Sequence, residues 1–382
     1  MQIIYATYQF FPDSRTNTFQ SISTIKNFIE KKYEVELVYP DRKETQNDIK
    51  EFYEIKNEFK ITKIKHSKKF EYKTQNFLNK VVYLCNHLLF ASRIKKYLKA
   101  SENRNFILYT RSPYVLFTSR NIQKKIIYEI HQITKVAKFF IWLSNKKNKK
   151  IVFVALTPFI KNYLHNLGVN EDNILHLETG YDENLFSEIE KYKIVRNNEI
   201  IRFVFGGSLE ISGLSKGLEK IILAFNELVK DGKLTKILFS IYCSNLEDKN
   251  KLDSFLKDQQ IKDFVHIHNR ITSKDFYQQL FTSHVGLIPL PDSEHVNKFS
   301  SSMKFFEYIR AGLVILGSNV EPNKRFNYKK MLFFENNLDS IKKAILESVN
   351  ILDINKDFSL DNIREYSYQN RVQKTIDKIN SI

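Results

Sequence analysis

A cluster of glycines and one lysine stands where an apolar run gives way to an amphipathic stretch. Gly206 and Gly207 close the run IIRFVFGG, and Gly213, Lys216 and Gly217 follow. Glycines let backbone N–H groups approach a diphosphate, a helix N-terminus adds partial positive charge, and a lysine neutralises a leaving phosphate. An ordinary glycine turn before a helix is the competing interpretation. Neither a Walker pattern nor GxGxxG is present, which disfavours a nucleotide-hydrolysing P-loop or a nicotinamide site.

A second candidate segment, residues 300–312, reads SSSMKFFEYIRAG and lies between the apolar runs HVGLIPL and LVILG. Its serines suit the start of a helix, and Lys304 stands three residues before Glu307. These two side chains can simply pair on a solvated helix face. The segment also opens where a strand is expected to end, and a carboxylate in that place can accept both hydroxyls of a ribose.

Strands and helices alternate along the first half of the chain. Apolar residues recur at helical spacing in residues 16–32 and 76–99. Short β-branched or aromatic runs bounded by polar residues predict the strands, which are MQIIYAT, EVELVYP, FILYT, KIIYEI, IVFVAL and NILHLE. This alternation predicts parallel strands connected by helices, and so a doubly wound, Rossmann-like α/β domain.

The pattern restarts after the polar stretch SEIEKYKIVRNNE, with a helix from about Lys216 and the strands IIRFVFGG, KILFSIYC, FVHIHN, HVGLIPL and LVILG. We therefore expect one α/β domain over residues 1–191 and a second over residues 192–360. A closing helix is expected over residues 361–382, packed toward the first domain. Ligands of such sheets bind at the carboxyl ends of the strands, so a cleft between the two domains is the predicted site.

Length and composition agree with two domains. The 382 residues exceed what one hydrophobic core usually organises, and 42% of them are apolar. Cys85 and Cys243 lie far apart without metal-ligand spacing, which disfavours a disulfide scaffold or a zinc site and favours a reducing cytoplasm. The start MQIIYATYQF has no basic leader, and no run approaches the roughly 18 apolar residues of a membrane span.

Positive charge is concentrated in one part of the chain. Residues 51–150 hold 23 Lys and Arg against 6 Asp and Glu, and this excess equals the net charge of +17 of the whole chain. A basic surface attracts nucleic acid, anionic lipid headgroups or a phosphorylated substrate, and a lysine-rich solvated surface is the alternative. Residues 137–150, AKFFIWLSNKKNKK, place an aromatic cluster beside four lysines. This combination suits an anionic membrane surface, and a core-packed helix before a lysine loop competes with it.

Three segments together resemble the retaining glycosyltransferases of family 4, which have the GT-B fold. GGSLEISGLSKGLEKIILAF is similar to the glycine turn, KG and amphipathic helix of that family's donor domain. SSMKFFEYIRAGLVILG is similar to its SPxKxFEYxAxG element, and TGYDENLF to the NGVDxxxF at its interdomain crossing. The resemblance implies two Rossmann-like domains, the first binding the acceptor and the second a nucleotide-sugar donor.

The resemblance also implies roles for residues of the second domain. Lys216 would contact the donor diphosphate, Glu307 the ribose, and the amides around Gly207 and Met303 the phosphates. A segment after the strand FVHIHN would flank the nucleobase. The full donor set is Gly206, Gly207, Lys216, Asn269, Arg270, Ile271, Ser302, Met303, Lys304 and Glu307.

Looser similarity extends through the first domain and the chain end. FPDSRTNTFQSIS, YTRSPY and YEIHQ resemble family segments, and EYSYQNRVQKTIDKI resembles the closing helix written YSWxxRxxxL. The resemblance makes His131, with Lys216, a catalytic candidate beside the reacting sugar, and Arg15, Asn17 and Arg111 acceptor contacts. The alternatives are a satisfied strand-end histidine for His131, a capping or surface role for Arg15, and a structural ion pair for Arg111.

The implied activity is transfer of a sugar from a nucleotide diphosphate to a hydroxyl of a glycan or lipid-linked acceptor. The resemblance implies a retaining reaction without metal or cofactor, in bacterial surface polysaccharide or glycolipid assembly, in the cytoplasm or on the inner face of its membrane. One departure is Phe299, where many members have a glutamate that reads the donor sugar. A GT-B epimerase or phosphorylase is the alternative enzyme, and a basic nucleic-acid- or membrane-binding protein the non-catalytic one. The basic segment holds no recognisable nucleic-acid module, so nucleic acid is not an expected partner.

Overall fold

The computed structural model describes residues 1–13, 15–41, 48–66, 77–101, 105–122, 125–192, 199–261, 263–352 and 360–382. The chain divides into two compact units. Unit 1 comprises Met1–Glu178 with Tyr368–Ile382, and unit 2 comprises Thr179–Ser367. The division therefore falls earlier than the predicted boundary near residue 192, part of whose surrounding polar stretch lies outside the described residues.

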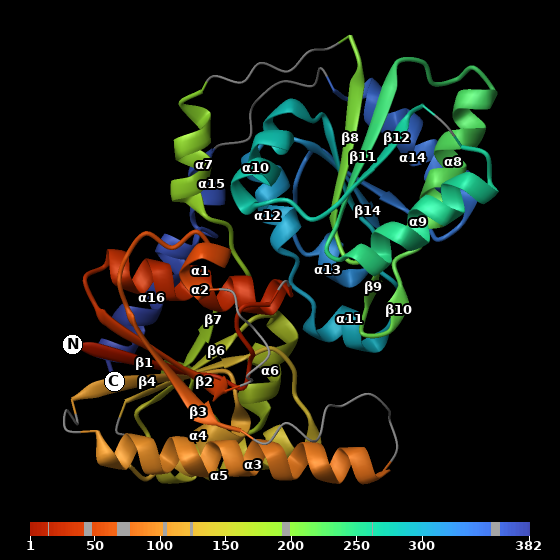
Figure 1. The fold of residues 1–382 in the computed structure, drawn as a ribbon. Helices are drawn as coiled ribbons and strands as arrows, with labels where there is room; N and C mark the ends of the chain where they lie inside the picture. Colours follow the sequence, from red (N-terminus) through yellow and green to blue (C-terminus); the bar gives the residue numbers. More distant parts are fainter. Residues whose placement is uncertain are drawn as a thin grey trace. The chain divides into compact units, whose positions relative to one another are not determined.

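Unit 1 is built on a seven-stranded parallel sheet with the strand order β3-β2-β1-β4-β5-β6-β7 (Figure 1). The strands are β1 (Gln2–Ala6), β2 (Glu34–Asp41), β3 (Lys60–Lys65), β4 (Phe106–Thr110), β5 (Ile126–Ile130), β6 (Ile151–Ala155) and β7 (Ile174–His176). Every residue of β4, β5 and β6 is buried, as expected for central parallel strands covered on both faces.

Helices cover both faces of this sheet, with α1 and α16 on one and α3, α4 and α5 on the other (Figure 1). The helices are α1 (Thr16–Glu30), α2 (Ile49–Phe52), α3 (Phe77–Ala100), α4 (Pro113–Ser119), α5 (Lys135–Lys147), α6 (Pro158–Asn166) and α16 (Tyr368–Asn380), with the 3-10 turn η1 (Glu171–Asn173). Val372, Ile376 and Ile379 of α16 join the apolar cluster formed by β1, β2 and α1. The chain end thus completes the core of unit 1.

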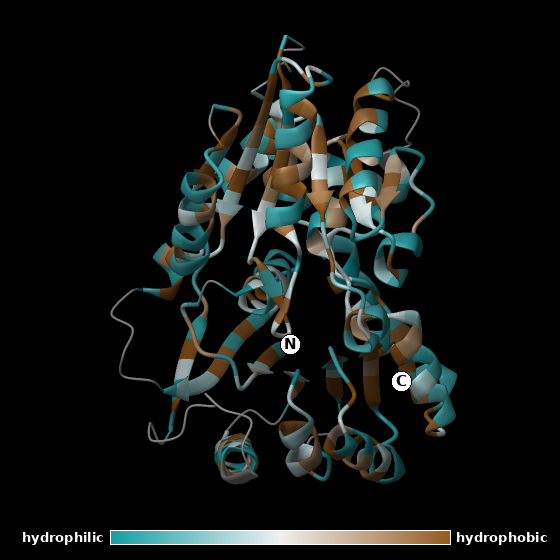
Figure 2. Cartoon of the chain, turned by 90° about the vertical axis from the view of Figure 1, so that its right-hand side faces the viewer, coloured by the Kyte–Doolittle hydropathy of each residue, from teal (hydrophilic) through white to brown (hydrophobic). Residues whose placement is uncertain are grey.

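Unit 2 has a six-stranded parallel sheet in the order β12-β11-β8-β13-β14-β15, and a two-stranded hairpin of β9 and β10. The strands are β8 (Ile201–Gly207), β9 (Glu210–Ile211), β10 (Leu214–Ser215), β11 (Ile237–Cys243), β12 (Val265–His268), β13 (Val285–Ile288), β14 (Val314–Ser318) and β15 (Met331–Phe334). The helices are α7 (Glu183–Glu190), α8 (Leu218–Lys230), α9 (Leu246–Asp258), α10 (Ser273–Thr282), α11 (Glu294–Phe299), α12 (Met303–Arg310), α13 (Glu321–Lys324), α14 (Leu338–Asn350) and α15 (Leu360–Arg364). Figure 2 shows the strands of the sheets mostly in the brown of apolar residues.

Helix α7 belongs to unit 2 because a buried arginine holds it there. The guanidinium of Arg310 donates to Glu183 at 2.9 Å and to Glu190 at 2.8 Å. The ring of Phe186 lies 4.0 Å from that of Tyr277 on α10. These contacts place residues 183–190 on unit 2, which is why the division precedes the predicted one.

Both sheets have the same strand order, in which the first strand of the unit lies between the second and the fourth. The order reverses between β1 and β4 in unit 1 and between β8 and β13 in unit 2. Ligands of open α/β sheets bind outside the carboxyl ends of the strands at such a reversal. The predicted fold of two doubly wound domains is confirmed, and each unit has one such place.

Candidate functional site

The carboxyl end of β8, at the reversal point of unit 2, consists of two glycines that are there for different reasons. A Cβ atom on Gly206 would lie 2.5 Å from the ring of Phe276, so only glycine fits against α10. Gly207 has a φ of +145°, which side chains rarely tolerate. The close packing at Gly206 and the positive φ at Gly207 together keep side chains off the last two residues of β8.

Lys216 returns to this strand end through the β9–β10 hairpin. Its ammonium lies 3.8 Å from the position of a Cβ atom on Gly207 and 3.5 Å from the hydroxyl oxygen of Ser208. Burial lowers the pKa of Lys216 to about 8, Asp248 raises it, and Lys304 lowers it further. Among the described residues no carboxylate pairs directly with Lys216, and a half-buried cation of this kind is suited to an anionic ligand.

Helix α12 supplies the second half of this arrangement. The ammonium of Lys304 donates to the carboxylate of Glu307 at 2.7 Å and lies 4.0 Å over the ring of Phe276. The Tyr277 hydroxyl donates to the same carboxylate at 3.3 Å. Glu307 is only 2% exposed, so the pair is not the solvated surface pair of the competing interpretation.

Glu307 keeps acceptor capacity despite these contacts. An ionised carboxylate offers about four lone-pair positions, and Lys304 and Tyr277 take two of them. Ser302 is the N-cap residue of α12, with no side-chain cap, and Met303 is the first helical residue. The backbone N–H groups of this first turn therefore have no side-chain cap, and the turn also contains Lys304.

Two of the predicted residues, Gly206 and Lys304, meet at the ring of Phe276. Glu307 joins them through Lys304, and Lys216 lies beside Gly207 at the same strand end. Asn269, Arg270 and Ile271 follow β12, two strands away from β8 on the same edge of the sheet. Ile271 packs on the apolar cluster that contains Phe276, whereas Asn269 is exposed. The predicted nucleobase segment therefore follows a strand of the same sheet, two strands from β8.

Unit 1 carries a buried carboxylate near the carboxyl end of β5, the strand next to β4. Glu129 on β5 is fully buried and accepts from four side chains, which are Tyr109, Arg111, His131 and Arg371. The two arginines and His131 hold the pKa of Glu129 well below its usual range, although burial opposes them. The carboxylate is therefore ionised, and its oxygens accept hydrogen bonds from four side chains.

Two predicted residues, His131 and Arg111, meet at Glu129. The Nε2 atom of His131 lies 2.7 Å from the carboxylate and must donate, because an ionised carboxylate only accepts. Burial, with Arg111 nearby, lowers the pKa of His131 to about 4. His131 is therefore neutral at pH 7, with Nδ1 as an acceptor.

The predicted acceptor residues divide into two groups. Arg111 is buried and donates to the backbone carbonyl of Asn17 at 2.8 Å and to the Ser21 hydroxyl at 3.0 Å, in addition to Glu129. Arg15 is exposed, and its guanidinium pairs with Asp13 at 2.6 Å. The structural ion pair offered as the alternative for Arg111 is what the structure contains, and Asn17 takes part through its backbone.

Solved structures share this architecture over their whole length. A glycosyltransferase from Rickettsia africae ESF-5 superimposes with a TM-score of 0.65 at 15% identity, covering 100% of this chain and 98% of that one. A sucrose-phosphate synthase from Thermosynechococcus elongatus gives 0.71 at 10% identity, with 100% and 99% covered. The chain has the GT-B fold.

A further GT-B structure is similar to this chain. It is an α,α-trehalose-phosphate synthase from Burkholderia xenovorans in complex with glucose-6-phosphate, with a TM-score of 0.65, 11% identity, and 99% of each chain covered. No family model matches the sequence. No curated protein matches it either.

Four residues of the two arrangements described above were not predicted, namely Phe276, Tyr277, Glu129 and Arg371. Phe276 and Tyr277 lie on α10, outside every segment with a recognisable pattern. Glu129 and Arg371 stand inside the segments YEIHQ and EYSYQNRVQ. The signal for Glu129 was an acidic residue inside an otherwise apolar strand, which demands a buried partner.

Within the described ranges, no three His, Cys, Asp or Glu side chains gather as ligands of a metal ion. Among the helices of those same ranges, none has both the length and the apolar character needed to cross a bilayer.

Proposed function

We propose that this chain is a glycosyltransferase that moves a sugar from a nucleotide diphosphate to a hydroxyl acceptor. The observation that carries the proposal is the half-buried ammonium of Lys216 beside Gly207, with a second ammonium, that of Lys304, close enough to lower its pKa. Both lie at the reversal point of the unit 2 sheet. The GT-B fold, shared with glycosyltransferases, supports the same activity.

The chemistry follows from where charge develops. Breaking the bond between sugar and diphosphate places negative charge on the leaving group and positive character on the anomeric carbon. Lys216 and the amides around Gly207 and Met303 stabilise that leaving charge. Glu307 accepts the ribose hydroxyls with its remaining lone pairs, and residues 269–271 flank the base.

Unit 1 supplies the acceptor side of the proposal. His131, neutral and held through Nε2 by Glu129, presents Nδ1 to the reacting sugar or the acceptor. Arg111 acts through Glu129 as a positioning residue, because its guanidinium is buried in that network. Arg15 is exposed at the start of α1, near Asn17 in the sequence, and supplies the positive charge that contacts the acceptor substrate.

We extend the proposal to the finer features of the reaction. Lys216 and Lys304 supply the positive charge that other transferases take from a metal ion, so transfer proceeds without metal or cofactor. Retention at the anomeric carbon rests on the family resemblance of the sequence alone. The acceptor is a glycan or lipid-linked sugar in surface polysaccharide or glycolipid assembly, and the reaction is cytoplasmic. The similar trehalose-phosphate synthase from Burkholderia xenovorans was solved in complex with glucose-6-phosphate, so sugar phosphates belong in the acceptor panel.

The test is release of nucleoside diphosphate from a panel of nucleotide sugars, with and without glycan, glycolipid and sugar-phosphate acceptors. We expect release that depends on one acceptor and persists with EDTA. A Lys216→Ala variant should lose on the order of a hundredfold in turnover, as for removal of one preorganised stabilising group. Turnover without any acceptor would favour an epimerase, and sugar 1-phosphate formed from inorganic phosphate a phosphorylase; either result would overturn the proposal.

A further inference from the structure

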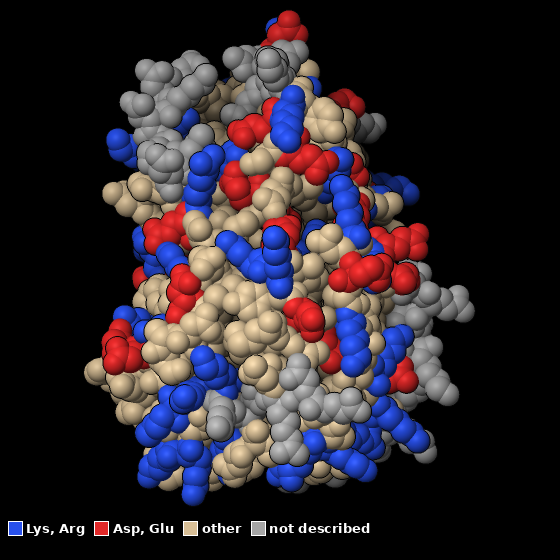
Figure 3. All heavy atoms as spheres, turned by 90° about the vertical axis from the view of Figure 1, so that its left-hand side faces the viewer, with Lys and Arg blue, Asp and Glu red and all other residues tan. Residues whose placement is uncertain are grey.

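Three helices on one face of the unit 1 sheet contain no acidic residue. They are α3, α4 and α5, and α4 packs against both of the others. Lysine and arginine side chains are frequent on the outer two, at positions 80, 93, 95, 96 and 99 of α3 and 135, 138, 146 and 147 of α5. Figure 3 shows Lys and Arg gathered along the lower edge, where α3 and α5 run in Figure 1.

The same helices expose much of the apolar surface of the molecule. Eleven large apolar side chains are exposed among the described residues, and six of them belong to α3 or α5. These six are Val81, Tyr83, Leu88, Leu89, Phe139 and Trp142. The surface that these six residues and the basic residues of α3 and α5 form is called the α3–α5 face below. Large apolar side chains gathered on a basic surface mark an interaction site.

Helix α5 presents its apolar and basic groups together. Phe139 and Trp142 stand one turn apart with their rings stacked and the ring centroids 6.3 Å apart. Phe139 is 54% exposed and Trp142 is 39% exposed. The ammonium of Lys146 lies 4.0 Å from the ring of Trp142. A lysine resting on an exposed tryptophan is the combination found at the level of lipid headgroups.

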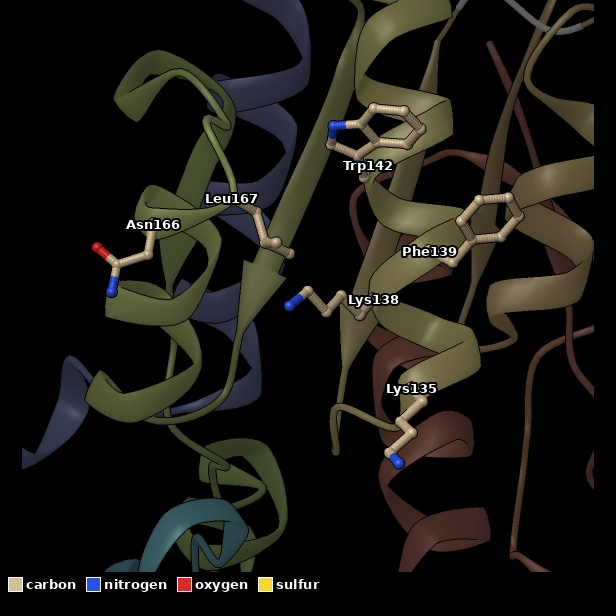
Figure 4. A pocket seen from close by; sticks show the side chains of 6 residues that line it. All are labelled: Lys135, Lys138, Phe139, Trp142, Asn166 and Leu167. Carbon is tan, nitrogen blue, oxygen red and sulfur yellow. The ribbon is translucent and has the colours of Figure 1, made fainter.

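A hollow of about 610 Å³ opens beside these rings. Its lining residues are Lys135, Lys138, Phe139, Trp142, Asn166 and Leu167 (Figure 4). In Figure 4 the ammonium of Lys138 points toward Leu167, on the other side of the hollow. The hollow therefore combines ammonium groups with apolar walls, as a phosphate headgroup and the start of its acyl chains require.

We propose that the α3–α5 face docks the chain onto an anionic lipid bilayer. Charge complementarity selects an anionic partner, since the three helices offer lysine and arginine and no carboxylate. Leu88, Leu89 and Val81 select lipid over nucleic acid, because aliphatic side chains neither stack on bases nor pair with phosphates. The docking is independent of sugar transfer, so its failure would leave the proposed function standing.

The single tryptophan of the chain allows a direct test, because Trp142 is one of the exposed side chains of the α3–α5 face. The full chain is mixed with phosphatidylcholine vesicles with or without phosphatidylglycerol, at low and high salt. We expect a blue shift of the emission and co-sedimentation only with phosphatidylglycerol, both weakened by salt. Lipids brominated in the acyl chains should quench the emission.

Matched variants distinguish binding through the α3–α5 face from non-specific hydrophobic adsorption to vesicles. Phe139→Ser with Leu89→Ser should lower the vesicle-bound fraction about tenfold, since both side chains insert. Leu246→Ser with Phe333→Ser removes two apolar side chains of unit 2 that are 63% and 40% exposed, and it should leave binding unchanged. Circular dichroism checks that each variant folds.

Three results would overturn the docking. The first is the absence of both emission shift and co-sedimentation at low salt. The second is binding to vesicles without quenching by brominated acyl chains, and the third is tighter binding to arbitrary duplex DNA than to vesicles. Either of the last two would make the α3–α5 face a general polyanion surface.

Discussion

The ammonium of Lys216 lies 3.8 Å from the position that a Cβ atom on Gly207 would occupy. The two residues are separated by the β9–β10 hairpin, and the hairpin returns the lysine to the strand it left. A methyl group on Gly207 would therefore be in van der Waals contact with the ammonium of Lys216.

Substitution of Gly207 by alanine should weaken nucleoside diphosphate binding by at least about tenfold. The φ of +145° strains any side chain by roughly 1–3 kcal/mol, and the new methyl group occupies the space beside the lysine. Gly232→Ala is the matched control, because Gly232 also has a positive φ, with nothing within 4 Å of its Cβ position. Titration calorimetry with nucleoside diphosphate measures the affinity of both variants. Equal affinities of Gly207→Ala and Gly232→Ala would contradict the assignment of Gly207 to the phosphate site.

The pH dependence of binding should report on Lys216. Its pKa of about 8 lies below that of a free lysine, so the ammonium loses its proton as the pH rises through 8. An anion binds the protonated form, and affinity for a nucleoside diphosphate should fall about tenfold between pH 7 and 9. Lys216→Arg should bind without this dependence, because arginine stays protonated. A flat profile for the parent would remove Lys216 from the phosphate site.

Glu307→Gln should weaken donor and nucleoside diphosphate binding on the order of ten- to hundredfold, while turnover at saturation changes little. A carboxylate that holds the ribose does so equally in the ground and transition states, and hydrogen bonds to a charged group are worth about 1.5–3 kcal/mol. Glu294→Gln is the control, since Glu294 makes a similar pair with Lys298 but is 80% exposed. Unchanged donor binding with lost turnover in the steady-state kinetics of Glu307→Gln would contradict its role as the ribose ligand.

Glu129→Gln should lower the free energy of unfolding by about 3–5 kcal/mol, because the buried guanidinium of Arg111 loses its counter-charge. Glu36→Gln is the matched variant. Glu36 is as well buried, but its cationic partner, Lys60, is 63% exposed and can be solvated. Chemical denaturation should show a clearly smaller loss for Glu36→Gln, and equal losses would contradict the account of this network.

Much of the fold was predictable because buried parallel strands have a strong pattern. The central strands β4, β5 and β6 are continuous apolar runs, and each was predicted. β3 was not predicted, since its sequence KITKIK alternates with lysine and lies at the sheet edge with one face exposed. Edge strands bury less, so their sequences carry less signal.

Contacts within one helix or turn were predictable, and contacts distant in sequence were not. The pairing of Lys304 with Glu307 follows from a spacing of three residues, although its burial does not. Arg371 and Glu129 are 242 residues apart, and no local pattern announces their contact. The same holds for Arg310 and Glu183, which hold α7 on unit 2 and move the domain boundary.

The most direct test of the donor site is the melting temperature of the chain with saturating nucleoside diphosphates, their sugar conjugates and the matching monophosphates. A ligand at about 100 times its Kd should raise the melting temperature by roughly 5–10 °C. We expect one diphosphate and its conjugates to do so, with the effect lost in Lys216→Ala. The effect should be kept in Lys220→Ala, because the ammonium of Lys220 donates to the backbone carbonyl and side chain of Asn336. No stabilisation by any diphosphate, or equal stabilisation of both variants, would contradict the account.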